Sequence, residues 1–280
     1  MKGFLFPSLL LAILLLLPSA AIHARQGSES RVSTLEQMQE DFQKIPCQPK
    51  KRLNAVRDLF AKMGAPSSDA SVEQSGSAKN YVVRREGAGP GMIVIGAHYD
   101  FVKEGCGAID NWTGIVVVAH MYRTISHMKT SKTVLFVAFD QEEVGRIGSR
   151  AMVQSILKTG KSHYCAMLNF DSFGMGKPFA LQDESSLKLV QLGIELADGM
   201  QVPFNQKVIS GFSDASSFLK QGIPAITLSG LTDGWPSVLH TEKDQQNAIS
   251  TDSVFVGYRL GLSMWSSIDA APCDSYREHP

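Results

Sequence analysis

The spacing of apolar and polar residues predicts two short helices near the beginning of the folded chain. In residues 33–44 and 51–63, apolar side chains recur every three or four positions, as on one face of an amphipathic helix. Prolines separate the two segments and Gly64 follows the second, so we expect both helices to be short. The Ser- and Gly-rich residues 66–79 are predicted as a loop.

From residue 80 onward, apolar runs alternate with amphipathic segments. Runs that are apolar throughout are typical of strands buried on both faces, and their alternation with helices indicates an α/β fold. We expect a mostly parallel mixed sheet covered by helices on both faces, in a single domain onto which the N-terminal helices pack. The expected strands are residues 80–85, 92–98, 132–139, 164–170, 207–210 and 224–229, and the expected helices are 113–127, 149–157, 185–200, 213–221 and 251–267.

The first residues follow a different pattern. Lys2 supplies a positive charge, residues 9–17 form a Leu- and Ile-rich run, and small residues follow at positions 19–21. This order is typical of a secretory signal peptide, which we place at residues 1–24, with cleavage after Ala21 or Ala24. The alternative is a membrane anchor, but the apolar run is shorter than the roughly 20 residues that span a bilayer. We therefore expect a secreted or periplasmic protein with no membrane partner after cleavage.

Composition excludes some partners and changes the interpretation of the cysteines. Lys plus Arg and Asp plus Glu both number 27, so no net basic charge attracts nucleic acid. In an oxidising compartment, an even number of cysteines predicts up to two disulfides, with three pairings open and free buried thiols as the alternative. The cysteines lack the close spacing of a zinc site; they are Cys47, Cys106, Cys165 and Cys273.

Histidine and carboxylate residues directly follow several expected strands. One strand ends in His98 and Asp100, the next is followed by the pair Glu142 and Glu143, and a third by Asp171. Ligands of open α/β sheets bind at the carboxyl ends of the strands, so these side chains should meet at one edge. Imidazole and carboxylate oxygen without thiolate are the ligands of a hydrolytic metal site.

Each of these features also has a simpler interpretation. Asp110 could cap the helix that follows it, and Glu142 and Glu143 could form a solvated acidic turn. A single loop histidine such as His240 is usually just exposed. Two adjacent carboxylates behind a buried strand repel each other, however, and a nearby cation would relieve that repulsion. We therefore expect a metal site.

Five motifs in order resemble the zinc aminopeptidase family with two co-catalytic metals, typified by secreted bacterial leucyl aminopeptidases. The resemblance covers most of residues 80–267. The motifs are GAHYD (96–100), GAIDNWTG (107–114), FDQEEVGRIGS (139–149), NFDSFG (169–174) and HTEKD (240–244).

The resemblance implies a zinc peptidase domain, residues 25–280, acting as a monomer on peptides with a free N-terminus. It implies two zinc ions bridged by Asp110, with His98 and Asp171 completing one site and Glu143 and His240 the other. Glu142 would be the general base that activates the water shared by the two ions, and Asp100 would orient His98.

The resemblance leaves two alternatives open. A glutaminyl cyclase has a similar fold but uses one zinc, which Asp110, Glu143 and His240 would hold, with Glu142 as proton shuttle. A secreted binding module that has lost catalysis is the non-enzyme alternative. Two departures from the family are visible: Ala215 replaces a common histidine, and the loop at residues 101–106 has no clear counterpart.

Overall fold

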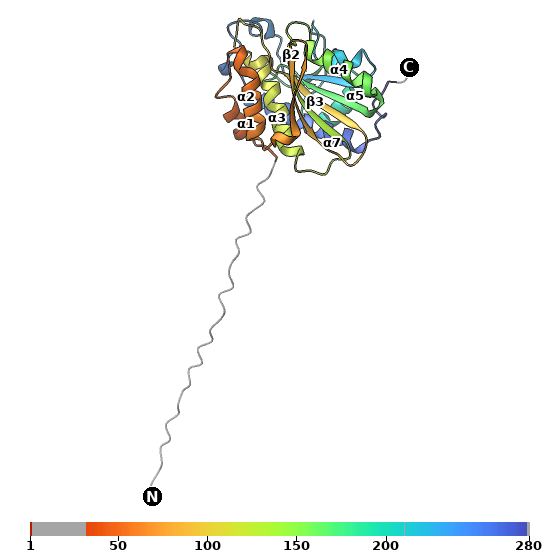
Figure 1. Ribbon diagram of the computed structural model, residues 1–280. Coiled ribbons are helices and arrows are strands. Elements are labelled where there is room, and N and C mark those ends of the chain that lie inside the picture. Colours follow the sequence, from red (N-terminus) through yellow and green to blue (C-terminus); the bar gives the residue numbers. More distant parts are fainter. Residues whose placement is uncertain (2–31, 210, 279–280) are drawn as a thin grey trace. The chain divides into compact units, whose positions relative to one another are not determined.

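An eight-stranded mixed sheet runs through the protein, whose computed structural model describes residues 1, 32–209 and 211–278 (Figure 1). The four neighbouring strands β4, β3, β5 and β8 are parallel, and antiparallel strands flank them on both sides. The predicted mostly parallel mixed sheet is therefore confirmed. In spatial order the strands are β1 (Ala70–Ser75), β2 (Ala78–Arg85), β4 (Thr133–Phe139), β3 (Met92–His98), β5 (Tyr164–Phe170), β8 (Ala225–Ser229), β6 (Phe179–Ser185) and β7 (Gln206–Lys207).

Helices cover both faces of the sheet, as the buried strands require. Side chains alternate between the two faces of β3: Ile93 and Ile95 belong to a core shared with α1, α2, α3, α5 and α7, whereas Val94 belongs to a core shared with α4 and α6. The helices are α1 (Leu35–Asp41), α2 (Pro49–Lys62), α3 (Thr113–Ile125), α4 (Ile147–Thr159), α5 (Leu187–Gly199), α6 (Ala215–Leu219) and α7 (Thr251–Ala270).

The two predicted N-terminal helices are present and pack onto the domain beside α3 (Figure 1). Helix α1 begins with a capping box, in which Thr34 and Gln37 satisfy each other's backbone N–H groups. Met38 of α1 and Phe60 of α2 are completely buried. The N-terminal helices therefore belong to the core of the domain.

Two strands are absent from the sequence prediction. Residues 66–79 were predicted as a loop, and this is wrong because they contain β1, which pairs with β2 through a tight turn at Gly76. The second missed strand is β6 at Phe179–Ser185. Both strands lie on flanks of the sheet. β1 is largely exposed and β6 has exposed polar residues in its middle, so neither has the continuous apolar run that marks a central strand. The strand expected at 207–210 is the short β7; residue 210 lies outside the described residues.

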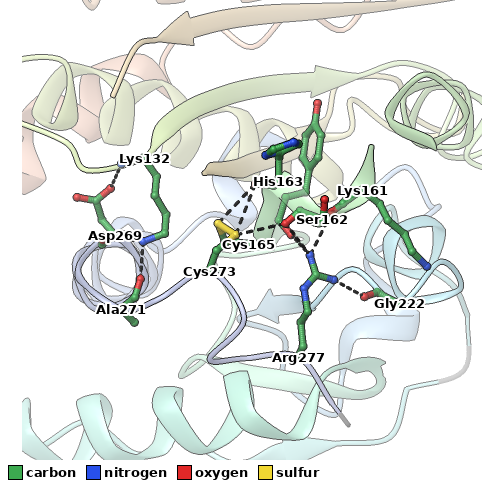
Figure 2. Close-up of a disulfide and its surroundings, with 11 residues drawn as sticks. Lys132, Lys161, Ser162, His163, Cys165, Gly222, Asp269, Ala271, Cys273 and Arg277 are labelled. Atoms are coloured by element: carbon green, nitrogen blue, oxygen red, sulfur yellow. Dashed lines mark hydrogen bonds between the residues drawn. A yellow bond between two sulfur atoms is a disulfide. The ribbon is translucent and has the colours of Figure 1, made fainter. Parts of the chain in front are cut away.

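The four cysteines form two disulfides, Cys47–Cys106 and Cys165–Cys273. The second ties the segment after α7 to the start of β5, and Arg277 strengthens this link by donating to four backbone carbonyls of the neighbouring loops (Figure 2). The prediction of disulfides is confirmed.

Among the described residues, no helix is both long and apolar enough to cross a membrane. Apart from Met1, the predicted signal peptide at residues 1–24 lies outside the described residues.

Candidate metal centre

The carboxyl ends of the parallel strands bring the predicted site residues together. His98 is the last residue of β3, Asp171 follows β5, and Glu143 lies in the turn between β4 and α4. Asp110 lies in the turn Ala108–Trp112 before α3, and His240 comes from the loop before α7. With Glu142, these five residues line one cavity of about 290 Å³.

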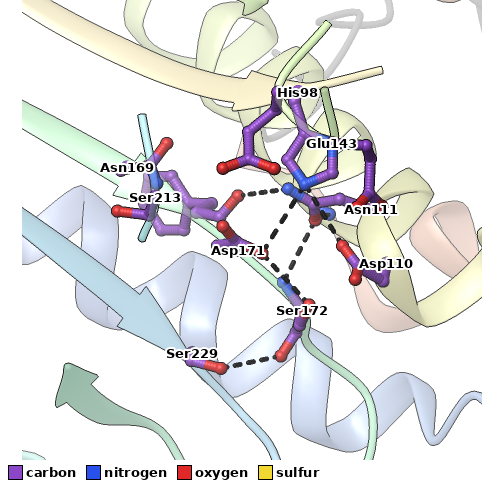
Figure 3. Close-up of polar contacts among 12 residues, drawn as sticks. His98, Asp110, Asn111, Glu143, Asn169, Asp171, Ser172, Ser213 and Ser229 are labelled. Atoms are coloured by element: carbon purple, nitrogen blue, oxygen red, sulfur yellow. Dashed lines mark hydrogen bonds and ion pairs between the residues drawn. The ribbon is translucent and has the colours of Figure 1, made fainter. Parts of the chain in front are cut away.

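Asp110 lies between the two histidines and faces each with a different oxygen. Figure 3 shows Asp110 beside His98. Its Oδ1 is 3.1 Å from His98 Nε2, and its Oδ2 is 3.0 Å from His240 Nε2. Asp171 lies 3.7 Å from His98 Nε2, and Glu143 lies 3.3 Å from His240 Nε2. The result is two triads with the spacing of metal ligands, His98–Asp110–Asp171 and Asp110–Glu143–His240, joined at one carboxylate.

The negatively charged side chains of the cavity favour the binding of cations. Three carboxylates surround the histidines, and one buried oxygen of Glu143 has no hydrogen-bond partner. Although burial opposes protonation of His98, Asp100, Asp110 and Asp171 outweigh it and hold its pKa well above the usual range. Hydrogen bonds that His240 donates to the carboxylates of Asp110 and Glu143 raise its pKa to about 10. The site thus attracts positive charge strongly, and its nitrogen and oxygen donors fit a zinc-type metal.

The two triads differ in their access to solvent. The His98 side chain is 2% exposed, whereas the His240 side chain is 52% exposed. The first triad therefore lies at the bottom of the cavity and the second at its mouth.

Asp100 has contacts that the sequence analysis did not foresee. One of its carboxylate oxygens is 3.5 Å from His98 Nδ1, in agreement with the expected orienting role. The same carboxylate also accepts hydrogen bonds from the backbone N–H groups of Glu142 and Glu143, at 3.0 and 3.1 Å. Asp100 therefore connects the histidine of one triad with the turn that carries both glutamates.

Glu142 lines the same cavity as the two triads, and its environment favours the protonated form. Burial raises its pKa to about 10, and the nearby carboxylates Asp214, Asp171 and Asp110 add to this shift. Asp214 is itself completely buried, and neither of its carboxylate oxygens has a hydrogen-bond partner. No sequence pattern had singled out Asp214. Its burial beside polar cavity residues marks it as part of the electrostatic environment of Glu142.

The turn that presents Asp110 is held by side chains from distant segments. Asp244 accepts hydrogen bonds from the backbone N–H groups of Ile109 and Asp110, at 2.6 and 3.2 Å. The Asn111 side chain accepts hydrogen bonds from the backbone N–H groups of Gly114 and Ser172 and donates one to the carbonyl of Phe170. These contacts fix the Asp110 carboxylate relative to the strand that carries Asp171.

The loop before this turn is anchored to the N-terminal helices. Arg52 of α2 is completely buried and donates to the carbonyls of Cys106 and Gly107. Its guanidinium also lies over the ring of Trp112, at 5.1 Å. The Cys47–Cys106 disulfide adds a covalent tie between the same two segments. The unmatched loop at residues 101–106 thus joins α2 to the metal centre, a role that no local pattern around Arg52 revealed.

Asp244→Ala is expected to destabilise the fold, because the backbone N–H groups of Ile109 and Asp110 would lose their acceptors. Each unsatisfied buried donor costs about 1–3 kcal/mol. The free energy of unfolding, measured by chemical denaturation, should fall by a few kcal/mol, and metal content should fall with it. Asp244→Asn retains one acceptor oxygen and should lose less. Equal stability of both variants and the unchanged protein would contradict this support.

One wall of the cavity is apolar. It is formed by a small hydrophobic cluster below the loops that close the site. Ala215, where the family commonly has a histidine, does not line this cavity; it is buried in the core on α6 with Phe139 and Phe218. The substitution therefore fills a core position and leaves the apolar wall intact. The apolar residues of that wall are Leu181, Ile209, Leu231, Trp235 and Leu239.

Comparison with known proteins agrees with the sequence resemblance. The model of Peptidase family M28 matches residues 80–256, which is well over half of the chain. A probable leucine aminopeptidase 2 from Aspergillus fumigatus is 27% identical over 190 residues, which cover 63% of this chain and 37% of that protein. The chain thus spans well under half the length of that curated relative.

Solved structures of two kinds share the fold. A zinc aminopeptidase from Bacillus subtilis superposes with a TM-score of 0.62 at 21% identity, covering 71% of this chain and 53% of that one. A glutaminyl cyclase from an Acidobacteriales bacterium superposes with a TM-score of 0.70 at 20% identity, covering 86% of this chain and 94% of that one. The fold alone therefore does not separate the two activities. The match over residues 80–256, which contains every residue of both triads, shows that the chain belongs to Peptidase family M28.

Proposed function

We propose that the protein is an exported aminopeptidase that uses two zinc ions to release the N-terminal residue of peptides. The observation that carries this proposal is the pair of triads sharing Asp110, with Glu142 beside them in the same cavity. The leucine aminopeptidase relative and the zinc aminopeptidase from Bacillus subtilis support the reaction and the metal. The leader-like residues 1–24 support export to a periplasm or the cell exterior.

In this proposal His98 and Asp171 would hold one ion, Glu143 and His240 would hold the other, and Asp110 would be a ligand of both. Two zinc ions supply Lewis-acid chemistry: they lower the pKa of a water and polarise the scissile carbonyl. Glu142 removes the proton of the attacking water and delivers it to the leaving amine. Its pKa, raised by burial, would fall beside two cations, because positive charge favours the carboxylate form. Glu142 could therefore act as a base near neutral pH.

The cavity also explains why cleavage would be limited to one end of a peptide. A free α-amine would bind a zinc ion or a carboxylate of the metal centre through its nitrogen, and acylation removes that ability. The side chain of the first residue would lie against the apolar wall formed by Leu181, Ile209, Leu231, Trp235 and Leu239. A cavity of about 290 Å³ has room for one such residue. Peptides with an apolar N-terminal residue are thus the preferred substrates.

The extent of the structural match favours a second candidate, a glutaminyl cyclase. The chain covers 94% of the Acidobacteriales cyclase but only 53% of the Bacillus subtilis aminopeptidase. A cyclase would use Asp110, Glu143 and His240 for one zinc and would have no need of the deeper triad. The presence of His98 and Asp171 at ligand distance makes the aminopeptidase the better proposal.

A set of three peptides tests the proposal. The mature, zinc-loaded protein should release leucine from a Leu-initiated peptide and leave its N-acetylated form intact. A Gln-initiated peptide should lose glutamine or remain unchanged, and mass spectrometry distinguishes these products. If the Gln peptide instead loses about 17 mass units, the mass of ammonia, while the Leu peptide stays intact, the protein is a cyclase.

A further inference from the structure

We propose that a basic groove between α4 and α6 binds acidic side chains of the peptide substrate, beyond the residue that is cleaved. This inference rests on the proposed aminopeptidase function and adds a substrate class to it. The groove has a volume of about 770 Å³. None of its nine lining residues is acidic, and three are cations: Arg146, Arg150 and Lys220.

The charge of this groove is not balanced locally. The chain as a whole is neutral, with 27 basic and 27 acidic residues. Within the part of the chain that the structure describes, however, Arg146, Arg150 and Lys220 take part in none of the ion pairs. Three unpaired cations around one cavity attract an anionic ligand, and guanidinium groups suit carboxylates in particular.

The groove begins where the metal centre ends. Phe212 lines the metal cavity and is 66% exposed. Two cations of the groove lie over its ring. The Arg146 guanidinium lies 4.6 Å from the ring centroid and the Lys220 ammonium 5.4 Å. Arg146 is also fixed by a hydrogen bond to Ser216. The side chain of Phe212 thus forms a wall between the two cavities.

The dimensions suit a few residues of extended peptide. The groove follows α4 from Ile147 to Gln154, seven positions that span about 10 Å. An extended chain covers that distance with about three residues. A peptide whose first residue lies in the metal cavity and whose chain passes Phe212 would place its third to fifth residues along the groove.

The two cavities would bind different parts of one peptide. The metal centre would bind the α-amine through a zinc ion or a carboxylate, and the groove presents cations to acidic side chains downstream. Such a substrate would be held in one direction, with its N-terminus toward Glu142. Exposed ion pairs are weak and salt-sensitive, so we expect a moderate preference that salt removes.

The test compares two peptides of equal length with amidated C-termini, Leu-Ala-Glu-Glu-Glu and Leu-Ala-Gln-Gln-Gln. At low salt, the zinc-loaded enzyme should show a KM about three- to tenfold lower for the Glu peptide, as expected for one or two exposed ion pairs. This preference should disappear at 0.5 M salt, a concentration of about the order that screens exposed charges. The double variant Arg150→Gln/Lys220→Gln should lose the preference and keep its turnover of leucine p-nitroanilide, which does not reach the groove.

Lys158→Gln is the matched control, because Lys158 lies on the same helix α4 but outside the groove; it should keep the preference. Equal KM values for the two peptides in the unchanged enzyme, or a preference that survives in the double variant, would overturn the proposal.

Binding of the same peptides to a Glu142→Gln variant, measured by fluorescence anisotropy, needs no turnover. If the variant binds the Glu peptide more tightly but the unchanged, zinc-loaded protein releases no leucine, the groove is retained and the aminopeptidase is rejected. If leucine is released but the two peptides bind equally well, the aminopeptidase is retained and the groove is rejected.

Discussion

Glu142→Gln is expected to abolish turnover while both metal ions remain bound. Glu142 lines the cavity but belongs to neither triad, so its loss removes the proton acceptor and no ligand. Removal of a general base typically lowers the rate by about 10²–10⁴-fold. Hydrolysis of a Leu-initiated peptide and metal analysis after dialysis measure the two effects separately.

Glu143→Gln is the neighbouring control. Glu143 lies 3.3 Å from His240 and belongs to the triad at the mouth of the cavity. This variant should lose metal as well as activity. If both variants lose the same amount of metal, the roles assigned to the two glutamates are wrong.

Asp110→Asn should empty both metal positions, because Asp110 is the one residue common to the two triads. Even outer-shell partners of metal ligands change affinity by about 10–100-fold, so removal of a bridging carboxylate should exceed that range. We expect two zinc ions in the unchanged protein, fewer than one in the variant, and activity at background. Metal analysis after equilibrium dialysis measures both.

Asp171→Asn separates a bridging role from a general loss of negative charge. Asp171 belongs only to the deeper triad, so this variant should retain one ion, held by Asp110, Glu143 and His240. Two ions bound to Asp110→Asn would contradict the shared carboxylate. One ion in the unchanged protein would favour the cyclase.

The central part of the fold could be predicted from the sequence because it is buried on both sides. The strands at residues 92–98 and 164–170 are mostly apolar and almost completely buried, and the structure has them with the same bounds. Strand β1, with the sequence ASVEQS, is almost entirely exposed and is held by its backbone pairing with β2. Such pairing leaves no mark in the hydrophobic pattern, so β1 was predicted as part of a loop.

The candidate ligands were predictable for a related reason. His98 and Asp171 directly follow buried strands, and parallel strands deliver such residues to the same edge of the sheet. Asp110 and His240 lie in turns without regular geometry, and the resemblance to a family was needed to single them out. Their distances from the other ligands agree with that assignment; their role as ligands stays a prediction until metal is measured.

The residues that support the centre could not be predicted. Arg52 contacts carbonyls more than 50 positions along the chain, and Asp244 contacts backbone N–H groups more than 130 positions before it. A buried arginine on an amphipathic helix looks in sequence like an exposed one. Contacts of this kind depend on how distant segments pack, which local patterns do not encode.

The order of the two triads along the chain has a consequence for how the protein matures. His98, Asp110 and Asp171, which form the deeper triad, all precede residue 172, whereas the triad at the mouth requires His240. Asp244, which fixes the turn of Asp110, comes later still. Chains are made and begin to fold from the N-terminus. A growing chain therefore has no complete pair of triads until nearly all of the domain has been made. If the proposed function holds, a newly made chain would thus stay inactive until residues 240–244 have folded onto the rest.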